Sequence, residues 1–250
     1  MINVLITGSS GFIGKNLINH LRTNNDILIM EFKRGDDDSY LESSILKADY
    51  IFHLAAEVRP KSNDDSFKSS NLDLTQKLIA ILDSHQKKIP ILFTSTVHAA
   101  NSTNAYGKTK RSAEQLIEGY SIINKVNCWI YRLPHVFGEG CKPNYNSVIS
   151  TWIYNAINNL ELNVFNREIE MTYCYVQDII QQFSKHLVSE ENDNKMYCSP
   201  SKLYETTLGE VVDIINAFKK GNVGYSNDSN PDFKDKLKRT YQWYCKKYAG

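Results

Sequence analysis

The chain has 250 residues, of which 42% are hydrophobic and 23% charged, and a formal net charge of +1. That length suffices for one large or two small domains, and the balanced charge favours neither nucleic acid nor a membrane as a partner. We find neither a signal peptide nor a run of ~20 apolar residues, so we expect a cytoplasmic protein. The five cysteines make no C-x-x-C pair, which predicts reduced thiols and no metal site.

The first fourteen residues predict the opening unit of a dinucleotide-binding sheet. The apolar run Ile2–Ile6 is typical of a strand, and Lys15–Arg22 has the apolar spacing of a helix. Three glycines join them, and such a turn lets a pyrophosphate approach the backbone at the helix N-terminus. A glycine turn without a ligand is the alternative, which the flanking strand and helix disfavour. The expected cofactor-binding residues are Gly8, Ser10, Gly11, Phe12 and Ile13, while Gly14 lets the helix lie close to the strand.

The end of the second predicted strand, Asp26–Phe32, bears on the choice of nicotinamide cofactor. Glu31 lies near the position at which an acidic residue binds the ribose 2′-hydroxyl of NAD. Lys33 and Arg34 follow at once, and adjacent cations suit the 2′-phosphate of NADP. Because two cations are the stronger phosphate signal, we expect NADP(H) rather than NAD(H), bound through Lys33 and Arg34.

Strands and helices alternate from there to Leu133, which predicts an α/β fold, a Rossmann-like doubly wound parallel sheet. The stretch from Arg34 to Lys47 is polar and short. His53 lies inside a predicted strand, where we expect a core histidine satisfied by the backbone rather than a catalytic one. The expected strands are Tyr50–Ala56, Ile89–Thr96 and Val126–Leu133, and the expected helices are Asn71–Leu82 and Tyr106–Ile123.

After Pro134 the pattern loosens into a long loop rich in glycine, proline and asparagine. We expect a single unit over residues 1–250, with 1–135 as its dinucleotide-binding part and 136–250 mainly as a smaller C-terminal substrate-binding lobe. Thr206 is the expected cap of the helix Thr207–Lys219. The other expected elements are the helices Ser147–Leu160 and Asp178–Val188, the strand Thr172–Val176 and a solvated helix face over Lys234–Lys247.

Thr96, Tyr106 and Lys110, behind the glycine turn, resemble the catalytic set of the extended short-chain dehydrogenases/reductases, also called the NAD-dependent epimerase/dehydratase family. The resemblance covers nearly the whole chain. Its other matches are His53–Ala56, Asn71, Tyr131–Gly138 and Tyr175–Asp178. Through Cys141–Ile149 and Thr207–Asp213 the chain is most similar to the reductase domain of CapF-type capsular-polysaccharide enzymes. Those enzymes also carry a C-terminal cupin domain, which we expect this chain to lack.

The resemblance implies a role for each residue of the site. Tyr106 would donate a proton, Lys110 would tune that tyrosine and bind the ribose, and Thr96 would orient the substrate carbonyl. A free tyrosine has a pKa of about 10, and a cation one helical turn away lowers it. The further expected cofactor contacts are Leu54, Ala55, Ala56, Asn71, Leu133 and Val136. The expected substrate contacts are Thr96, His98, His135, Lys142, Asn144, Asn146, Ser147 and Arg167.

The implied activity is NADPH-dependent reduction of the 4-keto group of a UDP- or dTDP-linked 6-deoxy-hexosulose, for bacterial surface-polysaccharide synthesis. No acidic pair follows Thr96, which disfavours a dehydratase. An epimerase or epimerase-reductase stays open, because His98, a residue type suited to acid–base chemistry, lies two residues after Thr96. A non-catalytic NADP(H)-binding sensor or scaffold is the alternative of another class, and the intact Thr96, Tyr106 and Lys110 set disfavours it.

The expected partner is a nucleotide-sugar substrate, with no nucleic acid and no membrane. Such proteins commonly pair through a four-helix interface. By that analogy we expect a homodimer, formed through the helices after Asn71 and Tyr106.

Overall fold

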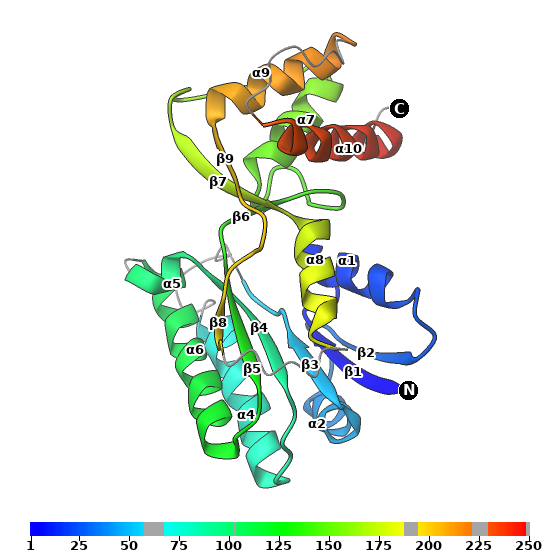
Figure 1. Ribbon diagram of the computed structural model, residues 1–250, viewed down its shortest axis with the longest axis vertical. Coiled ribbons are helices and arrows are strands. Elements are labelled where there is room, and N and C mark those ends of the chain that lie inside the picture. The colour runs from blue at the N-terminus through cyan, green and yellow to red at the C-terminus, as the bar shows by residue number, and fades with distance from the viewer. Residues whose placement is uncertain (58–67, 103, 188–194, 222–229, 249–250) are drawn as a thin grey trace. The chain divides into compact units, whose positions relative to one another are not determined.

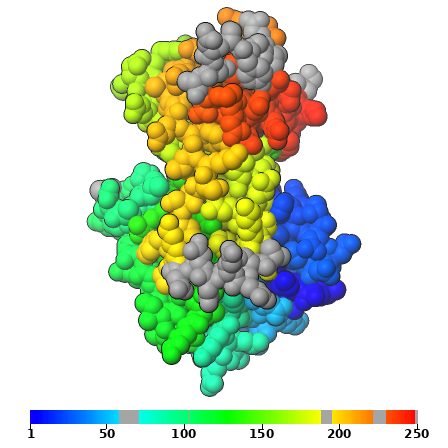
Figure 2. Space-filling model, in the orientation of Figure 1, coloured from blue at the N-terminus to red at the C-terminus, as the bar shows by residue number. Residues whose placement is uncertain are grey.

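The computed structural model describes residues 1–57, 68–102, 104–187, 195–221 and 230–248, and Figures 1 and 2 draw the others in grey. The chain divides into two units. The first contains Met1–Leu133 and Ile180–Pro200, and the second contains Pro134–Ile179 and Ser201–Gly250. Ile180–Pro200 therefore joins the first unit, although its place in the chain assigned it to the expected C-terminal lobe.

The first unit is built on a six-stranded parallel sheet (Figure 1). Its central strands β3 and β4 are buried along their whole length, as is usual for parallel strands that helices cover. The order β2-β1-β3-β4-β5-β8 changes direction between β1 and β3, where doubly wound sheets bind ligands. The strands are β1 (Ile2–Thr7), β2 (Ile27–Phe32), β3 (Tyr50–His53), β4 (Ile91–Thr96), β5 (Cys128–Leu133) and β8 (Tyr197–Cys198).

Helices pack on this sheet through apolar side chains that alternate along the strands. Leu5, Ile51 and Phe93 point to the same face, where they meet Leu78 of α4 and Ile117 of α6. This cluster is the core of the first unit and fixes α6 against β4 and β5. The helices are α1 (Phe12–Leu21), α2 (Asp38–Lys47), η1 (Lys68–Asp73), α4 (Leu74–Ser84), α5 (His98–Asn101) and α6 (Ala105–Asn124).

Two contacts explain why Ile180–Pro200 belongs to the first unit. The ring of Phe183, in α8 (Val176–Lys185), stacks on Phe52 of β3 with centroids 6.4 Å apart. Strand β8 adds to the edge of the sheet, where Tyr197 pairs with Ile130 of β5. Both contacts join residues far apart in sequence, so the local pattern does not predict them.

The second unit contains a three-stranded sheet and four helices, counting the start of α8, among its described residues. Strand β7 pairs with β6 in parallel and with β9 in antiparallel orientation. The core is aromatic: Phe137, Tyr173 and Phe233 are buried and their rings are in contact. Besides α8, the elements are β6 (His135–Phe137), α7 (Val148–Ile157), β7 (Glu170–Tyr175), β9 (Tyr204–Thr207), α9 (Leu208–Lys219) and α10 (Pro231–Tyr248).

One helix was not predicted, and one local prediction is wrong. The polar stretch between Arg34 and Lys47 contains helix α2, because Leu41 and Ile45 bury one turn apart against the sheet. The cap of α9 is Thr207 rather than Thr206: the Thr207 hydroxyl accepts a hydrogen bond from the Glu210 N–H, and the Glu210 carboxylate accepts one from the Thr207 N–H. No helix within the described ranges is long and apolar enough to cross a membrane.

Candidate active site

The glycine turn between β1 and α1 has a geometry that side chains would block. Gly8 has φ of +71°, and a Cβ there would lie 2.7 Å from the Cα of Ala55. A Cβ on Gly14 would lie 2.4 Å from the Gly8 carbonyl oxygen, so α1 packs directly on the turn. The turn closes through a hydrogen bond from the Gly11 N–H to the Gly8 carbonyl, 2.9 Å long. Gly8 and Gly14 therefore let the turn pack against the backbone of the β3 loop and of α1.

The N-terminus of α1 faces this turn. Gly11 is its N-cap, and no side chain in the described part of the chain caps it, so the N–H groups of Phe12 and Ile13 lack helical partners. Ser10 and Gly11 are exposed there. Free N–H groups and the helix dipole together suit a phosphate group.

The loop after β3 lies against the same turn, through contacts between Gly8 and Ala55. His53, just before this loop, is buried, with Nδ1 2.7 Å from the Thr7 hydroxyl and Nε2 2.8 Å from the Thr75 hydroxyl. The backbone was the expected partner of His53, and the structure supplies two side-chain hydroxyls instead. The loop residues Leu54 and Ala56 are buried and exposed, respectively.

Asn71 holds the far end of this loop. Its side-chain oxygen accepts a hydrogen bond from the Glu57 N–H at 2.7 Å, and its amide donates one to the Glu57 carbonyl at 3.1 Å. Asn71 is 1% exposed. Its amide therefore fixes the backbone beside the cofactor loop.

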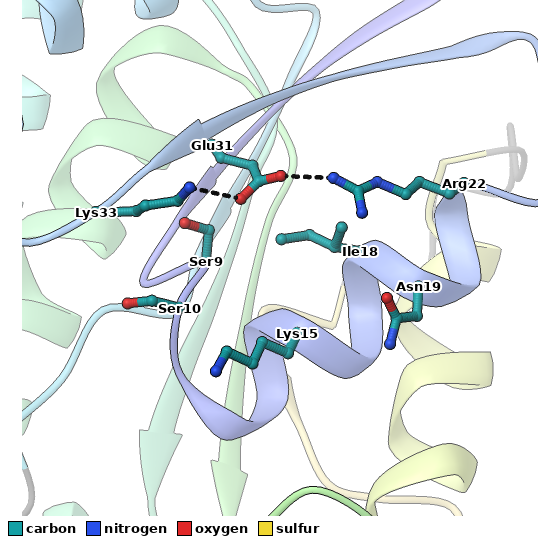
Figure 3. Close-up of a pocket in the computed structure, with 8 residues that line it drawn as sticks. All are labelled: Ser9, Ser10, Lys15, Ile18, Asn19, Arg22, Glu31 and Lys33. Carbon is teal, nitrogen blue, oxygen red and sulfur yellow. Dashed lines mark hydrogen bonds and ion pairs between the residues drawn. The ribbon is translucent and has the colours of Figure 1, made fainter.

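A pocket of about 450 Å³ lies between α1 and the end of β2 (Figure 3). The carboxylate of Glu31 lies between Arg22, 2.9 Å away, and Lys33, 3.3 Å away. Arg34 does not line this pocket, because its guanidinium pairs with Glu57 at 2.6 Å. The pocket is lined by Ser9, Ser10, Lys15, Ile18, Asn19, Arg22, Glu31 and Lys33.

Thr96, Tyr106 and Lys110 come from β4 and the start of α6. Thr96 is the last residue of β4 and is buried. Helix α6 begins after Asn104, whose side chain accepts a hydrogen bond from the Gly107 N–H at 2.7 Å. That cap places Tyr106 in the first turn and Lys110 one turn later on the same side.

Lys110 is a buried cation without a hydrogen-bonding partner in the described part of the chain. Its Nζ lies 3.9 Å from the ring centroid of Phe93 on β4. Burial lowers the pKa of Lys110 to about 7. The pKa of Tyr106 is not lowered by Lys110 as expected, because burial raises it to about 12. An unsatisfied buried donor is costly unless a ligand completes it. Lys110 and the glycine turn thus both fit a bound dinucleotide.

Two other expected contacts lie near Thr96 in the first unit. The His98 side chain is exposed, and its backbone N–H donates to the Thr96 hydroxyl at 3.3 Å. The Leu133 carbonyl, at the end of β5, accepts a hydrogen bond from the Val97 N–H at 3.2 Å. The ends of β4 and β5 therefore stay joined where the site residues emerge.

The remaining expected contacts belong to the second unit. Val136 and His135 lie in β6, where the exposed His135 pairs with Tyr173 of β7. Lys142, Asn144 and Asn146 are exposed residues of the loop before α7.

Two expected substrate contacts of the second unit already have partners within it. Ser147 caps α7, and its hydroxyl accepts a hydrogen bond from the Ser150 N–H. The Arg167 guanidinium pairs with Asp213 at 2.6 Å.

Sequence motifs do not identify several of the charged residues at the site. Lys15 on α1 and Arg22, its C-cap, are seven residues apart, so the helical period was a usable signal for placing both on the pocket side. No such signal joins Glu57 to Arg34 or Glu114 to Arg132, because these pairs are distant in the sequence. Among the described residues, no three His, Cys, Asp or Glu side chains gather as metal ligands would.

Comparison with known proteins gives matches over most of the chain. Residues 4–197 match the model of the NAD dependent epimerase/dehydratase family. The chain is 33% identical, over 220 residues, to a UDP-2-acetamido-2,6-beta-L-arabino-hexul-4-ose reductase of Pseudomonas aeruginosa, covering 87% of this chain. The structure of the capsular polysaccharide assembling protein CapF from Staphylococcus aureus superposes with a TM-score of 0.84 at 35% identity, covering 97% of this chain.

These relatives are longer than this chain, which spans 58% of the Pseudomonas reductase and 66% of the CapF chain. A UDP-glucuronic acid 4-epimerase from Bacillus cereus, solved with NAD, has a TM-score of 0.84 over 99% of this chain and 100% of its own. Its identity is 17%, so this likeness shows the α/β, Rossmann-like fold alone.

Proposed function

The chain belongs to the NAD dependent epimerase/dehydratase family, and we propose that it reduces the 4-keto group of a nucleotide-activated 6-deoxy-hexosulose, a UDP- or dTDP-sugar of bacterial surface-polysaccharide synthesis. The observation that carries the proposal is Lys110, a buried cation without a hydrogen-bond partner among the described residues. It lies one helical turn after Tyr106 and packs on the strand that ends in Thr96. The name of the Pseudomonas relative, a hexul-4-ose reductase, supports the choice of reaction.

Reduction of a ketone adds a hydride to carbon and a proton to oxygen. The nicotinamide cofactor supplies the hydride when it is bound. The Tyr106 hydroxyl gives its proton to the keto oxygen, while the Thr96 hydroxyl donates a hydrogen bond to that oxygen. Burial raises the pKa of Tyr106 to about 12, which keeps it protonated before the reaction. The Lys110 ammonium then stabilises the tyrosinate that remains.

The adenosine and diphosphate of the nicotinamide cofactor would bind at the β1–α1 turn and in the pocket of Figure 3. The pocket is lined by three cations, Lys15, Arg22 and Lys33, and by one carboxylate, Glu31. This excess of positive charge supports NADP(H), whose 2′-phosphate it would attract. Glu31, between two cations, could instead bind the ribose hydroxyls of NAD(H). The activity with NADPH must therefore be compared with the activity with NADH.

The test is NADPH oxidation, followed by absorbance, with 4-keto-6-deoxy sugars made in place by a dehydratase. UDP-N-acetyl and dTDP substrates are run side by side, each with NADPH and with NADH. We expect turnover with one nucleotide and faster turnover with NADPH. Product analysis separates simple reduction from epimerisation with reduction. Absence of oxidation with every substrate, despite NADPH binding, would contradict the proposal.

Tyr106→Phe distinguishes the enzyme from a non-catalytic binder. The variant keeps the ring and loses the proton, so we expect NADPH binding to persist and kcat to fall by about 10²–10⁴-fold. Tyr40→Phe is the matched control, because Tyr40 lies exposed on α2 and its loss should not alter turnover. Full biological activity of Tyr106→Phe would favour a sensor or scaffold instead.

A further inference from the structure

Glu114 is a buried carboxylate to which the proposed chemistry assigns no role. It lies on α6 one turn after Lys110 and is 0% exposed. The Ser95 hydroxyl donates to it at 2.6 Å, and Arg132 binds both of its oxygens through Nε at 3.0 Å and Nη2 at 2.7 Å. A buried charge with this many donors is held in one geometry.

The partners of Glu114 are themselves neighbours in the sheet. Ser95 on β4 and Arg132 on β5 are directly opposite each other in the register, and both lie on the face that α6 covers. The next residue along β4 is Thr96. Glu114 therefore ties the helix of Tyr106 and Lys110 to the ends of both strands, one residue from Thr96.

We propose that Glu114 is a positioning residue of the reductase site. It fixes α6 to the ends of β4 and β5, so that Tyr106 and Lys110 lie beside Thr96. It is also the counter-charge of Lys110. The inference deepens the proposed function and rests on it.

The charges around the two groups support this role. Glu114 faces Arg111 and Glu118 on its own helix, Arg132 on β5 and the Tyr197 hydroxyl on β8. Burial raises the pKa of Glu114, but hydrogen bonds from Arg132, Ser95 and Arg111 outweigh it and hold that pKa below its usual value. The carboxylate is thus ionised throughout the working range of pH.

Lys110 shares one side of α6 with Tyr106 and Glu114, and it also acts on the buried His53 of β3. Burial lowers the pKa of Lys110 to about 7, and Glu114 opposes that lowering. Removing the Glu114 charge therefore makes Lys110 lose its proton at a lower pH.

Glu114→Gln is the decisive variant, because it keeps the shape and removes the charge. We expect kcat to fall about tenfold or more with KM and NADPH binding nearly unchanged. The fall of kcat at high pH should move to lower pH. Glu118→Gln is the matched control: Glu118 also pairs with Arg111 and lies one turn further along α6, but among the described residues its other bond is to Tyr197 of β8, not to β4 or β5. It should leave kcat and its pH profile unchanged.

A second readout does not need turnover. The titration of Lys110 can be followed through its ¹³Cε shift in labelled protein, assigned by its loss in Lys110→Met. We expect the midpoint to fall by about one pH unit in Glu114→Gln and to stay in Glu118→Gln. If Glu114→Gln does not fold, Ser95→Ala removes only the bond to β4 and should lower kcat about threefold or more with the Lys110 titration unchanged.

Two outcomes separate this inference from the proposed function. A wild-type protein without turnover on any keto sugar overturns the reductase, while a shifted Lys110 titration in Glu114→Gln still supports the counter-charge. Conversely, Glu114→Gln with wild-type kcat, pH profile and Lys110 titration overturns the role of Glu114 and leaves the reductase standing.

Discussion

At the scale of the residue, His53 shows how burial decides what a titratable group can do. Both ring nitrogens are bonded to threonine hydroxyls, to Thr7 at 2.7 Å and to Thr75 at 2.8 Å. Burial lowers the pKa of His53 to about 3, and the nearby Lys110 lowers it further. The neutral imidazole is therefore a structural link between the end of β1 and α4, not an acid–base group.

This predicts a pH dependence of stability. An unfolded histidine titrates near pH 6.5, so between about pH 6.5 and 3 the unfolded chain binds one proton that the folded chain does not. The free energy of unfolding should fall as pH falls in that window, by up to about 1.4 kcal/mol per unit from His53. Urea unfolding at about pH 7 and about pH 5.5 measures the loss.

The matched variants are His53→Gln and His85→Gln. The first should be less stable at neutral pH but lose this part of the pH dependence, whereas the second should keep it, because His85 is an exposed partner of Glu42. Equal pH slopes in wild type and His53→Gln would contradict a neutral, buried imidazole.

The sequence predicts which residues act together when they are close in the chain, but it does not predict partners that are distant in the chain. Tyr106 and Lys110 are one helical turn apart, and the three glycines share one turn, so spacing alone predicts their grouping. Arg34 looks like a phosphate ligand beside Lys33, yet it pairs with Glu57, 23 positions away. No local pattern predicts that ion pair.

At the scale of the element, two helix caps have similar chemistry but different consequences. Asn104 caps α6 just before Tyr106, and Thr207 caps α9 in the second unit. Each cap satisfies a backbone N–H that the first helical turn leaves unpaired. Only the first cap orders a turn that carries a residue of the proposed chemistry.

Replacing each cap separates stability from activity. Asn104→Ala and Thr207→Ala should each cost ~1 kcal/mol, or about 2–4 °C in Tm. Only Asn104→Ala should lower kcat, by about tenfold, because fraying of the first turn displaces Tyr106. Calorimetry and the NADPH assay on the same preparations test this. An equal loss of kcat in both variants would mean that global stability, not the position of Tyr106, limits turnover.

Long, strongly patterned elements were predictable and short ones were not. The central strands are continuous buried runs, and the helix of Tyr106 buries residues at helical spacing. Strand β8 has two residues and β6 has three, and both exist because a neighbouring strand pairs with them. Helix α2 has few apolar residues, so only its packing reveals it.

At the scale of the whole molecule, the chain leaves the first unit after Leu133 and returns to it over Ile180–Pro200. Phe183 and Tyr197 give this segment its place, through an aromatic stack and a strand edge. Chain order suggests one boundary between the units, near residue 135. The two units of the structure instead meet at three points in the chain: after Leu133, before Ile180 and after Pro200. Tertiary contacts between distant residues cannot be inferred from one sequence.

Pairing of two copies is the last prediction. We propose a homodimer through α4 and α6, supported by Ile122 and Ile123, which are 71% and 80% exposed near the end of α6. Apolar side chains at such exposure are buried favourably in an interface. Light scattering at micromolar concentration should give about twice the chain mass of 28.7 kDa.

Changing Ile122 and Ile123 together to lysine should reduce that mass to 28.7 kDa, because two charges at the interface oppose association. Leu160→Lys is the matched control: Leu160 is 53% exposed but belongs to the second unit, so the dimer should persist. A monomeric wild type would contradict the proposed interface. A dimer that survives the double change would place the contact on another face, away from the end of α6.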